Sequence, residues 1–175
     1  MFWVELMNLI TGLHSQRLSR LIVQYRYDFI VSPFSVWCLL TLMAEGASGN
    51  TYSQLANVLR LPNDLHYIRQ AYHHVQKALV VNTTTVELSV IQALFSDVNR
   101  PLDSEYNDKL ENIYHADHVP VNFYDTAGAY NQINSYVDRQ THGKITKIVN
   151  TDDLRDAQMV LISSIFFKGQ WKVSG

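Results

Sequence analysis

The sequence predicts an α+β fold in which helices come first and strands and helices then alternate. Three observations predict it. Apolar residues recur at helical spacing between residues 18 and 80, period-two alternation marks strands at 86–95 and 119–123, and a long apolar run lies near the end. The chain has 175 residues, 47% of them hydrophobic and 17% charged. That composition is typical of one globular domain and excludes a disordered chain.

The first elements are helical apart from one short strand. Residues 18–25 have the spacing of an amphipathic helix, and residues 28–31 form a brief apolar strand. Ser32 and Pro33 then begin a second helix, because serine can cap free N–H groups and proline suits the first helical position. The glycines within 46–49 end this helix.

Two more helices are predicted before the first long strand. Thr51 and Gln54 have the spacing of a capping box, which indicates the start of a third helix. Leu61-Pro62 stops that helix, and residues 64–80 form a fourth.

Strands and helices alternate in the second half. The strand at 86–95 is followed by a helix at 102–113 and a strand at 119–123. Pro120 cannot donate to a ladder, which favours an edge position for that strand. A further helix is capped near Asp125 or Thr126, and Gly143 occupies the glycine position at its end.

The last strand raises a question of pairing. Residues 158–167 are almost continuously apolar, which is typical of a strand buried on both faces. Such a strand needs a hydrogen-bonded neighbour on each side. We therefore expect one flank of this strand to be vacant within these 175 residues.

Composition limits the function classes. The formal net charge of −2 gives no basic field, so we expect no nucleic-acid partner. No apolar run reaches the roughly 18 residues of a membrane span, so we expect no membrane association. Cys38 is the single cysteine and excludes internal disulfides.

The N-terminal residues and one triplet bear on localisation. Residues 1–15 are a candidate degenerate signal peptide, although Glu5 interrupts the apolar region, and they could equally begin an amphipathic helix. Asn82-Thr83-Thr84 is a candidate N-glycosylation site, although such triplets are common by chance. Together they favour an extracellular, secreted glycoprotein.

Four segments, taken in order, resemble the serpin family of serine protease inhibitors. They are "DFIVSPFSV" (28–36), "GASGNTYSQLANVL" (46–59), "INSYVDRQTHGKI" (133–145) and "IFFKGQW" (165–171). Each match alone is weak, but the ordered set is specific, and the resemblance covers residues 16–175.

The resemblance implies the N-terminal portion of the serpin fold, with helices packed on part of a large central β-sheet. In the family the strand at 158–167 is the third of that sheet, and its neighbour on the open side and the reactive loop are encoded later. The intact fold inhibits a serine protease as a suicide substrate, by inserting the cleaved loop as a new strand. Residues 16–175 would then be a partial domain lacking the C-terminal half and the reactive bond. We expect this chain not to inhibit alone, and to self-associate through the open strand.

The same resemblance assigns candidate site residues. The sheet-opening region comprises Ser32, Ser35, Ser163 and Trp171, and the end of the crossing helix comprises Thr141, Gly143 and Lys144. Without the resemblance, Ser32 is simply a helix cap and Ser35 a first-turn serine.

Several positions depart from the family pattern. Gln92 and Ser163 each stand where an asparagine is usual, and Tyr136 stands where a tryptophan is usual. The change at Ser163 puts a hydrogen bond of the sheet-opening region in doubt.

Other function classes are weaker. We expect no enzyme, no cofactor and no metal site, because His66 and His73 are spaced too widely for a chelating pair and His115 and His118 would point to opposite faces. Two alternatives stay open: a non-inhibitory binding module, with polyanion binding along residues 64–80 as one form, and an unstable fragment.

Overall fold

The computed structural model describes residues 32–170. They divide into two compact units, the first ending at Arg60 and the second beginning at Leu61. The predictions for residues 18–25 and 28–31, for the candidate signal peptide and for Trp171 lie outside this range.

The first unit contains helices α2 (Pro33–Gly46) and α3 (Gly49–Leu59), which contact each other. Ser32 is the N-cap of α2 and its hydroxyl accepts a hydrogen bond from the backbone N–H of Ser35, at 3.2 Å. The predicted capping box at Thr51 is wrong, because α3 begins two residues earlier. Gly49 has a φ of +55°, which residues with a β-carbon rarely adopt, and it turns the chain into the helix directly after Ser48.

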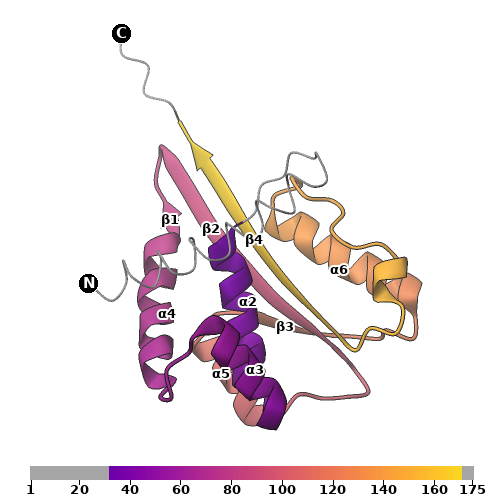
Figure 1. Cartoon of the computed structure of the whole chain (residues 1–175). Coiled ribbons are helices and arrows are strands. Elements are labelled where there is room, and N and C mark those ends of the chain that lie inside the picture. The colour runs from indigo at the N-terminus through magenta and orange to yellow at the C-terminus, as the bar shows by residue number, and fades with distance from the viewer. Residues whose placement is uncertain (1–31, 171–175) are drawn as a thin grey trace, which may run out of the picture. The chain divides into compact units, whose positions relative to one another are not determined.

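The second unit contains a four-stranded sheet, three α-helices and a short 3-10 turn (Figure 1). In chain order the elements are α4 (His66–Leu79), β1 (Val81–Asn82), β2 (Val86–Asp97), α5 (Ser104–Asn112), β3 (Asp117–Val121), α6 (Thr126–Gln140), η1 (Asp152–Leu154) and β4 (Met159–Gly169). Every predicted element from residue 64 onward is present, and β1 is an additional short strand. The cap of α6 is Asp125, whose carboxylate accepts from the N–H of Gly128.

Strand β2 is the centre of the sheet. It pairs antiparallel with β4 over nearly its whole length, from Val86 opposite Gly169 to Ser96 opposite Met159. On its other flank it pairs antiparallel with β1 at one end and parallel with β3 at the other. Among residues 32–170, β3 and β4 each pair only with β2, so both are edge strands. The edge position indicated by Pro120 is therefore confirmed.

Helix α6 covers one face of this sheet. Its apolar side joins β2, β3, η1 and β4 in one buried cluster: Ala93, Phe95, Val121, Phe123, Ala129, Ile133, Tyr136, Val137, Leu154 and Ile162. On the opposite face, Tyr72 of α4 donates a hydrogen bond to the side-chain carbonyl of Gln92, at 2.5 Å. The predicted class, helices packed on part of a sheet, is confirmed.

Strand β4 corrects one prediction. It extends two residues beyond the expected 158–167, and only Ile162 and Ser164 in it are buried. Phe167 is 67% exposed, so the strand is not buried on both faces as predicted. An edge strand has a neighbour on one side only, and its outer side chains are left partly uncovered.

Candidate functional site

The open edge of β4 is the most distinctive feature of the described chain. The N–H of Asp97 donates to the carbonyl of Gln158, and the N–H of Gln170 donates to the carbonyl of Thr85. Between these two points the register is unbroken, so the even-numbered residues of β4 exchange hydrogen bonds with β2. The odd-numbered residues therefore direct their N–H and C=O groups away from β2.

These outward groups form a ready template for another strand. They belong to Met159, Leu161, Ser163, Ile165 and Phe167. Within residues 32–170 no strand pairs with this flank. A row of unpaired backbone groups of this length is what an added strand recognises, because main-chain hydrogen bonds supply its affinity.

The hydrophobic side chains along the edge favour such an occupant. Met159, Ile165 and Phe167 are 41%, 39% and 67% exposed. Covering side chains of this size contributes about 1.5–3 kcal/mol each when burial is complete. The edge therefore offers both hydrogen bonds and apolar area to an incoming strand.

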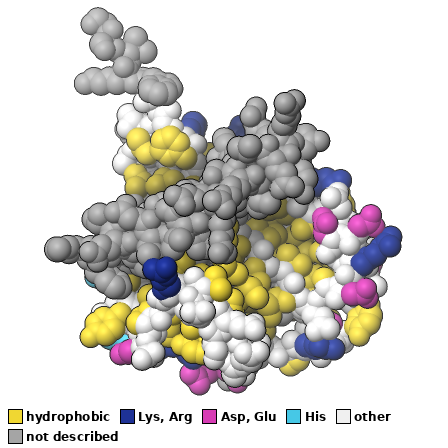
Figure 2. Space-filling view, in the orientation of Figure 1, with side chains coloured by type: hydrophobic (Ala, Val, Ile, Leu, Met, Phe, Trp, Pro, Cys, Tyr) yellow, Lys and Arg dark blue, Asp and Glu magenta, His cyan; other side chains and the backbone are white. Residues whose placement is uncertain are grey.

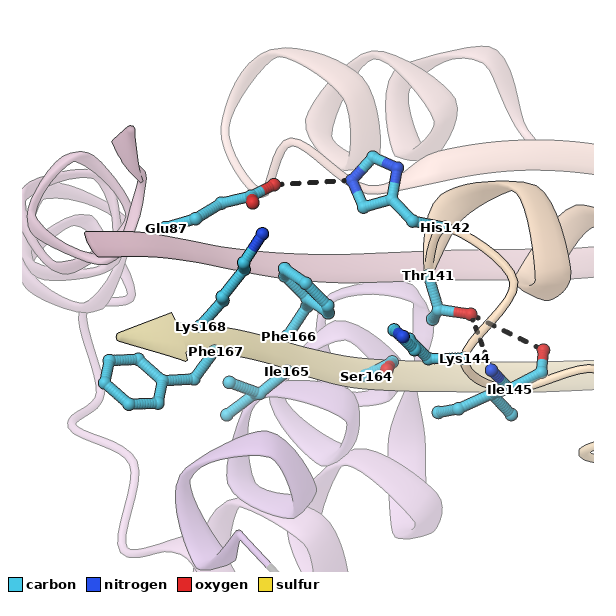
Figure 3. A pocket seen from close by; sticks show the side chains of 10 residues that line it. All are labelled: Glu87, Thr141, His142, Lys144, Ile145, Ser164, Ile165, Phe166, Phe167 and Lys168. Atoms are coloured by element: carbon cyan, nitrogen blue, oxygen red, sulfur yellow. Dashed lines mark hydrogen bonds and ion pairs between the residues drawn. The ribbon is translucent and has the colours of Figure 1, made fainter. Parts of the chain in front are cut away.

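A groove of about 660 Å³ lies on the α6 face of β4 (Figure 3). Phe166 lies on its β4 side, and the ring of His142 meets the Phe166 ring edge-on, with 5.4 Å between centroids. His142 Nε2 lies 3.4 Å from Glu87 Oε1, which joins the end of α6 to β2. Lys144 and Lys168 also line the groove. These contacts connect α6 to both long strands beside the open edge.

The end of α6 is closed by a two-bond C-cap. The N–H of Gly143 donates to the carbonyl of Asp138 at 2.8 Å, and the N–H of His142 donates to the carbonyl of Arg139 at 3.3 Å. His142 and Gly143 both have positive φ, +52° and +75°. The helix thus ends one residue earlier than predicted. His142, not Gly143, occupies the first position after the cap, where a left-handed backbone usually favours glycine.

Thr141 fastens this cap to the following segment. It is buried, and its hydroxyl donates to the carbonyl of Val137 and accepts from the N–H of Ile145, at 2.8 and 3.0 Å. Lys144, by contrast, is exposed, and only its backbone N–H takes part, by donating to the carbonyl of Thr141. The three residues assigned to the end of the crossing helix are therefore close together.

Asn134 fixes the same segment from inside α6. Its side-chain carbonyl accepts from the N–H groups of Ile148 and Val149, at 2.7 and 3.2 Å. Its amide donates to the carbonyls of Tyr130 and Val149. A buried asparagine that makes four hydrogen bonds to three residues positions the chain that leads into β4.

Ser163 and Gln92 face each other across β4 and β2. The hydroxyl of Ser163 and the side-chain amide nitrogen of Gln92 are buried and have no hydrogen-bond partner among the described residues. An unsatisfied buried polar group costs about 1–3 kcal/mol. Both residues stand where the family resemblance leads us to expect an asparagine. The two departures from the family pattern therefore lie opposite each other in the sheet.

Two other sheet-opening candidates are residues of the first unit. Ser32 and Ser35 belong to the first unit, where Ser35 is buried and its hydroxyl has no partner within residues 32–170. Asn82 is exposed on β1.

Two side-chain contacts hold β3 to its neighbours. Tyr136 donates from its hydroxyl to Asp117 Oδ2 at 2.6 Å, and burial together with this bond raises the pKa of the Tyr136 phenol. Ser96 Oγ and His118 Nε2 lie 2.8 Å apart, and burial lowers the pKa of His118, against an opposing effect of Glu111. Sequence reasoning found neither contact, because both join residues about 20 positions apart.

The visible surface carries mixed charge. In Figure 2, the visible basic and acidic side chains of the described residues are scattered and lie near one another in several places. None of the helices within residues 32–170 is long and apolar enough to cross a membrane.

The family comparison agrees with this architecture. A family model described as serpin (serine protease inhibitor) matches residues 15–174. The chain belongs to the serpin family.

The relatives include proteins named as alpha-1-antitrypsin-like and proteins named as corticosteroid-binding. An alpha-1-antitrypsin-like protein of Tamias sibiricus is 33% identical over 151 residues, which cover 83% of this chain and 36% of that protein. Corticosteroid-binding globulin of Ovis aries is 33% identical over 147 residues, which cover 82% and 34%. Among solved structures, Serpin48 of Tenebrio molitor has a TM-score of 0.85 at 25% identity and covers 97% of this chain and 46% of that one.

The chain spans about a third of the length of these two curated relatives. The residues that match the family model include β4, whose outer flank has no partner strand among residues 32–170.

Proposed function

We propose that this chain is the strand-accepting part of a protease-inhibiting serpin. The observation that carries the proposal is the open, apolar edge of β4. In this proposal a strand encoded by the rest of the family's domain pairs with the odd-numbered residues of β4. Inhibition of a serine protease then belongs to the longer protein, and these 175 residues alone do not inhibit.

The sheet-opening and helix-end residues have distinct roles in this proposal. Ser163 lies on the accepting edge, where its backbone N–H and C=O groups face the incoming strand. Thr141, Gly143 and Lys144 end the helix that covers the sheet beside that edge. Ser32 and Ser35 are proposed on the family resemblance to lie under the sheet centre, with Trp171 near the point where insertion begins.

The inhibition claim is tested with purified proteases. The chain is incubated with trypsin and with chymotrypsin, and the mixtures are resolved by denaturing gel electrophoresis. We expect no adduct that resists SDS, and cleavage products only. A covalent band at the summed mass of chain and protease would overturn the claim.

The strand-accepting claim is tested separately with a labelled extended peptide. A peptide of about 12 small and β-branched residues should bind the chain and raise its fluorescence anisotropy. Ile165→Pro removes one outward N–H and should weaken this binding. Ser104→Pro, at the exposed first position of α5 where proline is tolerated, should not. Equal binding to both variants would contradict the proposal.

A non-inhibitory carrier is the second candidate. The similarity to corticosteroid-binding globulin favours it, since that relative matches as well as the alpha-1-antitrypsin-like protein does. Equilibrium dialysis against a radiolabelled corticosteroid distinguishes the two: saturable binding by the chain supports a carrier, and its absence favours the inhibitor role.

Secretion and glycosylation complete the proposal. One relative is described as a plasma protein, and Asn82 is exposed beside the exposed Thr84. Expression in a secreting eukaryotic cell should give a product whose mass falls on treatment with an N-glycosidase, and Asn82→Gln should abolish that change.

A further inference from the structure

Two histidines from different elements come together away from β4. His73 lies on α4 and His115 directly follows α5, and both belong to the second unit. Their ring centroids are 5.8 Å apart and their planes meet at 40°. Sequence reasoning compared histidines only along the chain and so did not consider this pair.

The separation suits a shared metal ion. A zinc–imidazole bond is about 2.0–2.1 Å, and the nitrogen lies about 1.2 Å from its ring centre, so each centroid would lie roughly 3.2 Å from the metal. At a tetrahedral angle, two such rings have centroids roughly 5.2 Å apart. The observed 5.8 Å differs by about half an ångström, which small side-chain rotations can close.

The residues before the two histidines hold them in place. Tyr72 and Tyr114 are both buried, and their rings pack edge-to-face with 4.7 Å between centroids. Tyr72 is fixed further by its hydrogen bond to Gln92 of β2. Because each histidine follows one of these tyrosines, the pair is positioned by the core beneath it.

His115 also has an unusual backbone. Its φ is +49°, in the left-handed region that costs a residue with a β-carbon roughly 1–2 kcal/mol. Strain of this kind is a reason to look for a function.

Two charged neighbours of the pair have opposite effects on a bound cation. Lys77, one turn after His73 on α4, repels a cation, whereas Glu111, which lines the same surface hollow as His115, attracts one.

We propose that His73 and His115 bind one divalent transition-metal ion of the zinc, nickel and copper class. Water completes the coordination, because the described residues contain no group of three or more His, Cys, Asp or Glu side chains suited to hold a metal. The ion ties α4 to the segment that connects α5 with β3. Hard cations such as Mg²⁺, which prefer oxygen ligands, do not replace it.

Isothermal titration with Zn²⁺ at pH 7.5, at a concentration where sedimentation shows a monomer, tests the site. The chain should show saturable binding of one ion, and Mg²⁺ should give no heat. His73→Gln and His115→Asn should each weaken zinc binding at least about tenfold; asparagine is chosen because it tolerates the left-handed backbone. His74→Gln, the adjacent histidine, is the matched control and should stay within about twofold.

A second measurement separates ligation from structural support. The Cu²⁺ electron paramagnetic resonance spectrum should show coupling to two nitrogens in the parent chain and to one in either ligand variant. The proposal is overturned if zinc binding does not saturate, if His74→Gln weakens it as much as His73→Gln, or if the two-nitrogen pattern survives in His115→Asn.

Discussion

Strands β2 and β4 are neighbours of similar length and similar apolar content, but their surroundings differ. β2 has strands on both flanks, and every residue from Gln92 to Asp97 is buried. β4 has a described partner on one flank only, and Met159, Ile165 and Phe167 are exposed. The apolar sequence of a strand therefore indicates that the strand suits a buried position. Whether its side chains are actually buried depends on the elements packed beside it.

The largest expected difference between the two strands is in the cost of removing a phenylalanine. Phe95 of β2 is fully buried and packs edge-to-face on Tyr136, so Phe95→Ala should lower the free energy of unfolding by about 3–5 kcal/mol. Phe167→Ala on β4 should change it by less than about 0.5 kcal/mol. Urea unfolding followed by circular dichroism measures both, and equal losses would remove the contrast between the strands.

Proline substitutions separate the two flanks of β4 itself. Ser164 directs its N–H toward β2, so Ser164→Pro should cost about 3 kcal/mol or more. Ile165 directs its N–H outward, and Ile165→Pro should cost about 1 kcal/mol or less, since an edge strand tolerates proline there. If Ile165→Pro destabilised the chain as much as Ser164→Pro, the outer flank of β4 would have a partner.

Substitutions at the contact between α6 and β3 should change the free energy of unfolding by a smaller amount. Tyr136→Phe keeps the ring against Phe95 and removes the bond to Asp117, so we expect a loss of about 1–2 kcal/mol. Asp117→Asn, measured in the same way, should cost less because an amide oxygen can still accept the bond. A neutral Tyr136→Phe would show that packing alone holds α6 to β3.

The smallest expected effect concerns pH. Burial lowers the pKa of His118 in the folded state below its ordinary value of 6.5, so the unfolded chain binds the proton more readily. This contribution is fully present above pH 6.5 and is lost as the pH falls through that value toward the lowered folded pKa. Thermal unfolding at pH 7.5 and pH 5.5 should show a fall in stability that is smaller in His118→Gln. An identical fall in stability in His118→Gln would show that titratable groups other than His118 cause the pH dependence.

Self-association of the chain should occur through the open edge of β4 and not through β2, which has strands on both flanks. Ile165→Lys places a charge on the open edge and should lower the sedimentation coefficient of any oligomer toward that of the monomer. A lysine at the exposed Val58 is the control and should leave the association unchanged.

Much of the fold could be predicted because local patterns determine it. The period-two alternation located β2 and β3, and Pro120 indicated an edge. Ser32 was recognised as a cap from its side-chain chemistry, and the cap of α6 was placed at Asp125 or Thr126, of which the structure has Asp125. The flank of β4 that has no partner strand among residues 32–170 could also be predicted, because the sequence pattern offered no further strand to pair with it.

The failures involve interactions that no local pattern contains. The start of α3 depended on the backbone of Gly49, and His142 as well as Gly143 took a left-handed backbone after α6. The contacts of His142 with Glu87 and Phe166, and the pairing of His73 with His115, join segments that only the tertiary fold brings together. Sequence spacing carries no signal for such pairs.

Amide hydrogen exchange resolved by residue tests the open edge of β4 most directly. At a concentration where the chain is monomeric, the N–H groups of Leu161, Ser163, Ile165 and Phe167 should exchange at least about a hundredfold faster than those of Val160, Ile162, Ser164 and Phe166. Equal protection of both sets in the monomer would contradict the account, because the outer flank of β4 would then already be paired.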